Sequence, residues 1–397
     1  MIARDSYLRQ LIDFKDKAVT KVITGIRRSG KSTLLKAFVD YLKQSGVKED
    51  NIIFLNLESF KYETIRDYYS LYHLIQDKIT TQEKYYILLD EVQNVDKFEK
   101  AVESLSIDFN VDIYLTGSNA YMLSTELATL LSGRYVEIRM WPLSFKEYYS
   151  VWQPEDKEKI FYQYMRYGGF PFIAKENDEN IITNYLDGIY NTVVLKDIIK
   201  RNNIKDVSLL ESILKMVLSA IGSEISPSSI ARTLKGQGKQ ISSETIEKYL
   251  DMFSSAFILQ KAVRYDIKGK AYLKTLSKYY VSDMGLRNNV LGYRQMEVTH
   301  ALENMVYFEL IRRGYKVDVG KIKDNEIDFL ARKKDKIEYY QVCFTVNNSK
   351  ETLDREIRPF NNLDDHYQRF LITMDKDFVS DISGIQKLYA VDWFLQE

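Results

Sequence analysis

The residues with the clearest chemical capacity lie in one stretch, Gly25-Ile26-Arg27-Arg28-Ser29-Gly30-Lys31-Ser32. Its spacing is that of a GxxxxGK[ST] phosphate-binding loop. Glycines allow such a loop to wrap a phosphate with backbone N–H groups, and the helix that follows adds its positive N-terminal end. We expect Lys31 to reach the β and γ phosphates of a nucleotide and Ser32 to give a hydroxyl to Mg²⁺. The residues expected to contact the nucleotide are Gly25, Arg28, Ser29, Gly30, Lys31, Ser32 and Thr33.

The flanking sequence predicts the elements that would hold this loop. Residues 18–24 are β-branched and mostly apolar, which favours a strand. Residues 33–42 repeat apolar side chains at three-to-four spacing, which favours a helix. A phosphate-binding loop requires a strand before it and a helix after it, and both are predicted here. The alternative, a chance glycine-rich turn, would not require these flanking elements.

A second acidic pair follows an apolar run at residues 85–91, with Asp90 lying 59 positions after Lys31. We expect this run to form a parallel strand beside the phosphate loop, so that its carboxyl end completes the site. Asp90 would then hold Mg²⁺ through water, and Glu91 would orient and polarise an attacking water. The alternative is a strand that ends in solvated acids, but the alternating strand–helix pattern favours a paired site.

Three further strands are predicted over residues 51–58, 111–119 and 131–138. Asn119, or Ser118, ends the second of them and could touch the γ-phosphate or the water. Arg134 lies at the mouth of the last strand. The alternative for Arg134 is a surface arginine that closes a helix.

The composition indicates a soluble, multidomain protein. A chain of 397 residues exceeds one ordinary core, and hydrophobic and charged fractions of 45% and 28% are typical of globular proteins. Fifty-six basic residues balance fifty-six acidic ones, so the net charge does not recruit nucleic acid and only a local patch could bind it. No apolar run is long enough to cross a membrane, and one cysteine with three scattered histidines predicts no zinc cluster. We expect a cytoplasmic protein without a signal peptide.

This order of motifs resembles the AAA+ ATPases, in particular a bacterial and archaeal branch with Gly-Arg after the last sensor strand, over residues 1 to about 205. The resemblance implies ATP and Mg²⁺ as ligands. It matches Lys31 and Ser32 to the first Walker motif, Asp90 and Glu91 to the second, and Asn119 to the sensor residue. It makes Arg134 an arginine finger, which usually reaches the γ-phosphate of a neighbouring subunit and so implies a homo-oligomer. Residues 143–205 would be the helical lid, where Arg166 and Arg201 are candidates for a second phosphate sensor.

Residues 206–290 predict a winged helix. Helices are expected over 209–221, 228–234 and 243–253, and strands over 257–265 and 278–282 around a basic turn. Such a module could bind double-stranded DNA. The lysines available for this contact are Lys235, Lys239, Lys248, Lys268 and Lys270. The third helix, however, carries Glu244, Glu247 and Asp251, which would repel phosphates, so a protein-contacting or spacer role is the favoured alternative.

Residues 291–397 resemble the restriction-endonuclease-like fold. In that fold an Asp and an acid-x-Lys pair on adjacent strands bind a metal, and Glu303 and Asp328 match acidic positions. Gln341 stands where a second metal ligand would be and Cys343 where the lysine would be. A thiol does not carry the lysine's positive charge, so this domain is expected to be degenerate.

The sequence as a whole predicts an α/β protein with an AAA+ P-loop parallel sheet over residues 1–142, a helical lid over 143–205, a winged helix over 206–290 and a small α/β nuclease-like domain over 291–397. The expected chemistry is Mg²⁺-dependent hydrolysis of ATP that drives a conformational change, with Lys31, Glu91, Asn119 and Arg134 as catalytic residues. The alternative is a nucleotide-gated DNA-binding or interaction protein with little turnover.

Overall fold

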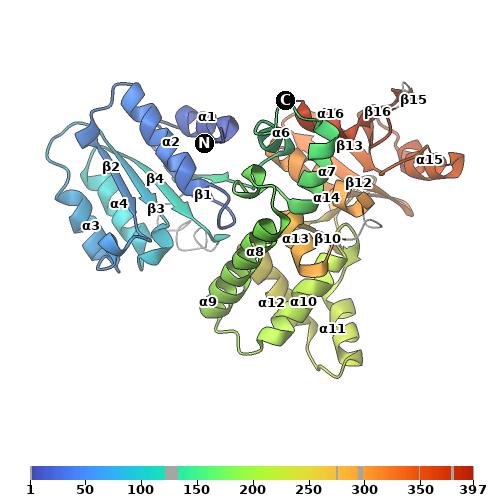
Figure 1. Ribbon diagram of the computed structural model, residues 1–397, viewed down its shortest axis with the longest axis horizontal. Coiled ribbons are helices and arrows are strands. Elements are labelled where there is room, and N and C mark those ends of the chain that lie inside the picture. Colours follow the sequence, from blue (N-terminus) through green and yellow to red (C-terminus); the bar gives the residue numbers. More distant parts are fainter. Residues whose placement is uncertain are drawn as a thin grey trace. The chain divides into compact units, whose positions relative to one another are not determined.

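The computed structural model describes residues 2–120, 133–273, 276–293, 298–347, 349–376 and 380–396 (Figure 1). These residues gather into two compact units. The first contains Met1–Trp141 with Ser255–Phe257, and the second contains Pro142–Ser254 with Ile258–Glu397. The predicted boundary after residue 142 lies next to this division, whereas the predicted boundaries after residues 205 and 290 lie inside the second unit.

The first unit is built on a five-stranded parallel sheet in the order β2-β3-β4-β1-β5. Parallel strands all end at the same edge, so the segments after β1, β3 and β4 meet there. The elements are α1 (Asp5–Asp13), β1 (Thr20–Thr24), α2 (Lys31–Gln44), η1 (Glu49–Asn51), β2 (Ile52–Asn56), η2 (Phe60–Tyr62), α3 (Tyr68–Gln76), β3 (Tyr85–Asp90), η3 (Val92–Asn94), α4 (Phe98–Asp108), β4 (Val111–Gly117) and β5 (Tyr135–Arg139).

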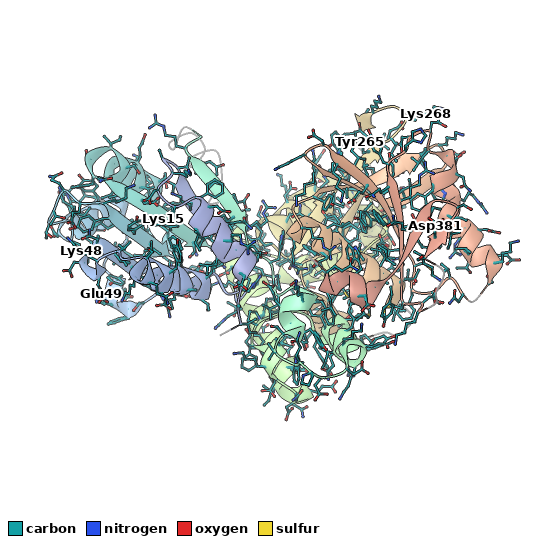
Figure 2. The ribbon with its side chains drawn as sticks, turned by 90° about the horizontal axis from the view of Figure 1, so that it is seen from above. Lys15, Lys48, Glu49, Tyr265, Lys268 and Asp381 are labelled. Carbon is teal, nitrogen blue, oxygen red and sulfur yellow. The ribbon has the colours of Figure 1, made fainter. Side chains whose placement is uncertain are left out.

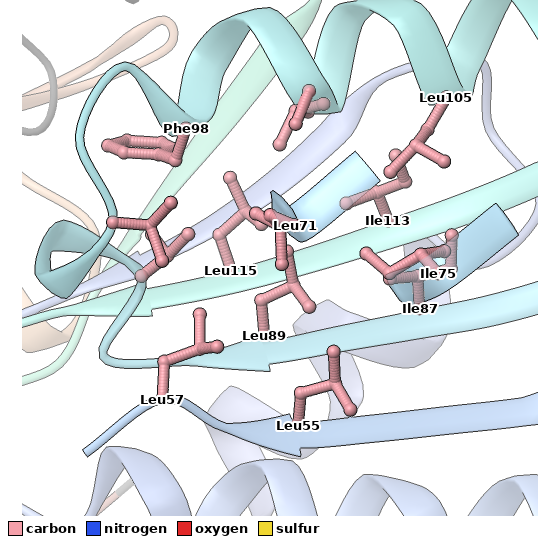
Figure 3. Packing of buried hydrophobic residues seen from close by; sticks show 14 of the residues in the cluster. Leu55, Leu57, Leu71, Ile75, Ile87, Leu89, Phe98, Leu105, Ile113 and Leu115 are labelled. Carbon is pink, nitrogen blue, oxygen red and sulfur yellow. The ribbon is translucent and has the colours of Figure 1, made fainter. Parts of the chain in front are cut away.

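Helices cover both faces of this sheet, because its central strands are apolar on both sides. On β3, Ile87 and Leu89 pack in a cluster with α3 and α4, whereas Tyr86 and Leu88 pack in another with α1 and α2. Figure 3 shows the first cluster, in which Leu71 of α3 and other apolar side chains fill the space above the strands. The sheet is therefore the middle of three layers, and its rigid strands fix the positions of the side chains at their ends.

The second unit contains two sheets. One has three antiparallel strands in the order β6-β10-β7, and the other has eight in the order β15-β16-β14-β13-β12-β11-β8-β9. Its helices are α6 (Phe145–Tyr149), α7 (Lys157–Tyr167), η5 (Ile173–Lys175), α8 (Glu179–Tyr190), the π-helical η6 (Asn191–Ile199), α9 (Lys200–Asn202), α10 (Val207–Ser219), α11 (Pro227–Gly236), α12 (Ser243–Ser255), α13 (Met284–Leu291), α14 (Val298–Arg312), α15 (Lys350–Ile357), η8 (Arg358–Asn362) and α16 (Ala390–Leu395). Its strands are β6 (Glu224–Ile225), β7 (Leu259–Ala262), β8 (Arg264–Asp266), β9 (Ala271–Tyr272), β10 (Ser277–Val281), β11 (Lys316–Ile322), β12 (Asn325–Lys333), β13 (Lys336–Val342), β14 (Gln368–Thr373), β15 (Asp381–Ile382) and β16 (Ile385–Tyr389).

The basic turn expected at the tip of a winged helix lies in the larger sheet instead. The strand predicted over residues 257–265 is divided into β7, which pairs with β10, and β8, which pairs with β9 and runs parallel to β11. Asp266 closes the β8–β9 turn by accepting hydrogen bonds from the backbone N–H groups of Lys268 and Gly269, at 3.1 and 2.9 Å. Figure 2 labels Tyr265 on β8 and Lys268 in the turn. Lys268 and Lys270 thus extend a different sheet from the one beside α11 and α12.

The Gly168-Gly169 pair after α7 is a docking point within the second unit. Gly168 ends α7 with φ of 80°, and a Cβ atom there would lie 2.0 Å from the Asp283 carboxylate. Asp283 accepts a 2.7 Å hydrogen bond from the N–H of Gly169 and caps α13 through the N–H of Leu286 at 3.1 Å. Burial raises the pKa of Asp283 to about 6 although these N–H groups oppose the shift. Close approach to a buried carboxylate therefore explains a glycine at position 168.

A helix suited to crossing a membrane, both long and apolar, does not occur in the described part of the chain.

Candidate nucleotide-binding site

The phosphate-binding loop connects β1 to α2 in a conformation that its glycines permit. Gly25 has φ of 147°, and a Cβ atom at this position would lie 2.1 Å from the carbonyl oxygen of Met140. Gly30 has φ of 105° and caps α2, which begins at Lys31. Arg28 also has a positive φ, 66°, and is exposed, as is Thr33 in the first turn of α2. The loop therefore has the turn that the motif predicts, and position 25 excludes any side chain.

Arg4 of the N-terminal segment links this loop to Trp141, and Tyr7 also contacts Trp141; sequence reasoning missed both residues. The buried guanidinium of Arg4 donates to the carbonyl of Ser29 at 3.0 Å and to the carbonyl of Trp141 at 2.8 Å. The hydroxyl of Tyr7 accepts a hydrogen bond from the N–H of Trp141 at 3.2 Å. An arginine directly before an amphipathic helix gave no signal of these backbone partners, because they lie far away in the sequence.

Lys31 is buried inside the loop and faces the second acidic pair. Its ammonium donates to the carbonyls of Gly25 and Ile26 at 2.9 and 3.2 Å, and lies 3.9 Å from Oε1 of Glu91. Burial lowers the pKa of Lys31, while the carboxylates of Glu91 and Asp90 act in the opposite direction. A buried ammonium is a group that would stabilise an anionic phosphate once phosphate oxygens replace the two carbonyls.

Asp90 is held by a residue on β4 that the sequence reading did not select. The Thr116 hydroxyl donates to Oδ1 of Asp90 at 2.6 Å and accepts from the N–H of Glu91 at 2.9 Å. In the sheet, β4 lies between β1 and β3, the strand that ends at Asp90. Thr116, on this intervening strand, therefore holds both the Asp90 carboxylate and the backbone of Glu91. Sequence reasoning missed Thr116 because it lies inside a β-branched run.

The oxygen atoms at this edge suit Mg²⁺. Oδ2 of Asp90 is buried and has no hydrogen-bond donor among the described residues. The hydroxyl of Ser29 is also buried and has no hydrogen-bond partner among them. Burial raises the pKa of Asp90, and the Ser32 hydroxyl lies close enough to lower it through a hydrogen bond. Residues 2–120 and the other described ranges contain no group of three His, Cys, Asp or Glu side chains placed for a metal. Mg²⁺ commonly takes one or two protein ligands together with substrate phosphates.

Glu91 directly follows β3 in a left-handed conformation, with φ of 56°. Its Oε1 faces Lys31, and its Oε2 accepts a short hydrogen bond from the side-chain N–H of Gln93. The same amide nitrogen lies 3.4 Å from the hydroxyl of Ser118 at the end of β4. Asn119, the predicted sensor, is buried at this edge next to Ser118. Gln93 is thus a site residue that sequence reasoning missed.

Arg134 lies at the other edge of the same sheet. Its carbonyl accepts from the N–H of Thr20, the first residue of β1, and its side chain is exposed. Because β1 is five residues long, roughly 15 Å separates this edge from the phosphate loop. Arg134 therefore cannot serve the site of its own chain, and its role as a finger for a neighbouring subunit stays a prediction. In the second unit, Arg166 forms an exposed ion pair with Glu179.

The acids predicted in the nuclease-like part do come together, and a lysine lies among them. Lys278 of β10 is 3.1 Å from Glu303, 2.7 Å from Glu326 and 3.9 Å from Asp328. Burial lowers the pKa of Lys278, but the carboxylates outweigh it and raise that pKa above its usual range. Asp328 is also buried, which with the charge of Glu303 raises its pKa. The lysine of the nuclease-like pattern is absent at position 343, as expected. A different cation, Lys278 of another strand, lies among these carboxylates instead.

Gln341 and Cys343, the two departures from the nuclease-like pattern, also lie near this cluster. The side-chain oxygen of Gln341 accepts from the N–H of Asp328 at 3.3 Å, and its amide nitrogen donates to Glu356 at 3.1 Å. The thiol of Cys343 donates to the carbonyl of Thr345 at 3.2 Å, and burial raises its pKa to about 11. Cys343 is therefore a neutral group in place of the expected lysine.

Removing the charge of Lys278 is expected to destabilise the second unit strongly. The Lys278→Met substitution would leave buried carboxylates without their cation, which typically costs about 3–5 kcal/mol. Equilibrium denaturation by urea measures this loss. Lys157→Met is the matched control, because Lys157 pairs with Asp392 at an exposed position, where the loss should be about 1 kcal/mol or less. Equal stability of the two variants would show that the cluster does not depend on Lys278.

Comparison with protein families agrees with this geometry. The family model of the AAA domain matches residues 17–149, which include the phosphate loop, Asp90, Glu91 and Arg134. The model of a domain of unknown function, DUF8612, matches residues 158–297. Among solved structures, the Walker-type ATPase of Pyrococcus abyssi has a TM-score of 0.52 at 15% identity, covering 73% of this chain and 96% of that one. This likeness concerns the fold alone.

Two relatives extend the similarity over most of the chain. An uncharacterized protein of Haemophilus influenzae is 45% identical over 100% of this chain and 99% of its own length. An uncharacterized protein of Methanocaldococcus jannaschii is 31% identical over 86% of this chain and 77% of its own length. The chain belongs to the family of these two proteins, and its residues 17–149 match the family model of an AAA domain.

Proposed function

We propose that this protein binds ATP with Mg²⁺ and hydrolyses it to ADP and phosphate to drive a conformational change. The observation that carries the proposal is the meeting of Lys31, Asp90 and Glu91 at one edge of the sheet, with 3.9 Å between the Lys31 ammonium and the Glu91 carboxylate. Lys31 would exchange its two loop carbonyls for phosphate oxygens, and the backbone N–H groups of the loop would hold the same phosphates. The Glu91 carboxylate would then face the water that attacks.

Ser32 and Asp90 are the residues that would hold Mg²⁺, directly and through water. When bound, this ion would neutralise charge on the phosphates. The chain's own contribution is to fix these oxygens, since Thr116 orients Asp90 through a 2.6 Å hydrogen bond. Asn119 and Ser118 at the end of β4 would contact the γ-phosphate or the water.

An ATPase assay on purified protein, with and without double-stranded DNA and at two salt concentrations, tests this proposal. We expect turnover that requires Mg²⁺. Stimulation by DNA that fades with salt would indicate phosphate contacts. A slow rate without stimulation would favour the alternative, in which ATP occupancy alone sets the conformation. No Mg²⁺-dependent turnover and no nucleotide binding would contradict the proposal.

For the three helices α10, α11 and α12 with the sheet β6-β10-β7, we favour contact with a protein over contact with DNA. Glu244, Glu247 and Asp251 are all exposed on α12, where a major groove would bring phosphates close. Lys235 and Lys248 are exposed on α11 and α12, whereas the ammonium of Lys239 lies 3.3 Å from the hydroxyl of Ser212 on α10. A homo-oligomer is proposed on the basis of Arg134 alone.

The nuclease-like part is proposed to keep its fold without cutting nucleic acid. Lys278 already pairs with Glu303 and Glu326, carboxylates that a metal would require, and no lysine stands at position 343. Supercoiled plasmid, linear duplex and single-stranded DNA should therefore remain intact with Mg²⁺ or Mn²⁺. Cleavage that is lost in Asp328→Ala but kept in Lys31→Ala would show an active nuclease.

A further inference from the structure

Gln93 lies in the short 3₁₀ helix η3, three positions after the end of β3. Its amide nitrogen donates to Oε2 of Glu91 and lies 3.4 Å from the hydroxyl of Ser118. Gln93 therefore links the end of β3 to the end of β4 through side chains. Neither the family motif nor the proposed mechanism assigns a task to this residue.

The orientation of the Gln93 amide follows from chemistry. A carboxylate only accepts hydrogen bonds, so the atom facing Oε2 of Glu91 must be the NH₂ group and not the carbonyl oxygen. The carbonyl oxygen of Gln93 then points elsewhere. It is buried and meets no donor in the described ranges of the chain. A buried acceptor without a donor costs about 1–3 kcal/mol, so it favours a partner that can donate.

The two oxygens of Glu91 are thereby distinguished. Oε2 is held by Gln93, and Oε1 faces the Lys31 ammonium at 3.9 Å. Because Lys31 marks the place of the phosphates, Oε1 is the oxygen directed toward the reacting group. Holding one oxygen by a neutral amide leaves the other in a defined position.

We propose that Gln93 is a positioning residue for the attacking water, an inference that rests on the proposed ATPase function. Its NH₂ group fixes Glu91, and its carbonyl oxygen accepts one hydrogen of the water while Oε1 of Glu91 accepts the other. With both hydrogens held, a lone pair of the water is directed at the γ-phosphorus.

In the step itself, the water oxygen forms a bond to the γ-phosphorus, and the bond from that phosphorus to the β,γ-bridging oxygen breaks. The electron pair of the broken bond leaves with ADP. One proton of the water goes to Glu91, and the other stays on the phosphate that is released. Gln93 gains and loses no proton, so its effect is entirely on geometry.

Two near-isosteric substitutions test this role. Gln93→Met removes both polar atoms, and Gln93→Glu keeps an acceptor but places a second carboxylate against Glu91. We expect kcat for ATP hydrolysis to fall about 10- to 100-fold in both variants, with a larger fall in Gln93→Glu. KM and the dissociation constant of ATP should stay within about twofold of the wild type, because the residue acts on the water and not on bound nucleotide.

Matched controls are Gln82→Met and Gln82→Glu, since Gln82 is exposed in the same unit. These should leave kcat and KM unchanged. Nucleotide binding by the Gln93 variants shows that they are folded. A second test is the combination with Glu91→Gln, in which Gln93→Met should cause little further loss if it acts through Glu91.

The outcomes separate this inference from the function on which it rests. Unchanged kcat in both Gln93 variants, or a raised KM at constant kcat, overturns the positioning role while ATPase activity stands. Full additivity with Glu91→Gln overturns it as well. A wild-type protein without turnover overturns the proposed function and this inference together. Turnover that survives Glu91→Gln overturns the inference and the role of Glu91, while ATP hydrolysis itself stands.

Discussion

Glu91→Gln protein is expected to bind ATP normally and to lose at least about 100-fold in hydrolysis rate. Glutamine has the same shape as glutamate but cannot take a proton from water. The remaining parts of the site would be preserved, because the N–H of residue 91 bonds to Thr116 through the backbone. Calorimetry measures ATP binding, and phosphate release measures turnover.

Lys31→Ala is expected to have a different effect, the loss of ATP binding itself. Lys31 is the buried cation of the loop, and its removal would leave phosphate charge without a counter-ion. Lys36→Ala is the matched control, because Lys36 is exposed on the same helix. Unchanged turnover in Glu91→Gln would remove that residue from the mechanism, and unchanged ATP affinity in Lys31→Ala would remove the loop from nucleotide binding.

The strands and the acidic pair of the first unit could be predicted because their signals are local. Apolar runs such as residues 85–89 can be recognised without knowledge of their partners, and the acids directly after them must lie at a strand end. Gly25 was also predictable, because the GxxxxGK[ST] spacing is local. The structure gives the reason for the glycine, a positive φ and the close approach of Met140. The expected strands over 51–58, 85–91 and 111–119 correspond to β2, β3 and β4.

Most of the residues that sequence reasoning missed act through distant partners, although Gln93 contacts Glu91 only two positions away. Arg4 contacts Trp141, 137 positions away, and Lys278 contacts Glu303, 25 positions away. Neither pair leaves a periodic pattern in the sequence, because each side chain alone is an ordinary basic residue in an element of its own. The pairing of β8 with β11 was hidden for the same reason, since a strand's partner depends on contacts that the strand does not encode.

Mixing two inactive variants is expected to restore activity if Arg134 serves a neighbouring subunit. Arg134 lies at the start of β5, whereas the phosphate loop follows the end of β1, at the opposite edge of the sheet. Arg134→Ala alone should lose about 10³-fold in kcat, because a guanidinium stabilises charge on the transferring phosphoryl group. Lys31→Ala alone should be inactive because it binds no ATP.

In a mixed assembly, an Arg134→Ala subunit still binds ATP, and its Lys31→Ala neighbour still supplies the arginine. Activity should therefore appear on mixing and rise with the fraction of mixed interfaces. Arg139→Ala is a useful contrast, because Arg139 pairs with Glu137 of its own strand at 3.0 Å. Mixing this variant with Lys31→Ala protein should therefore not restore activity. A protein that is monomeric and fully active at the assay concentration would exclude the shared site, because roughly 15 Å lies between Arg134 and the phosphate loop of the same chain.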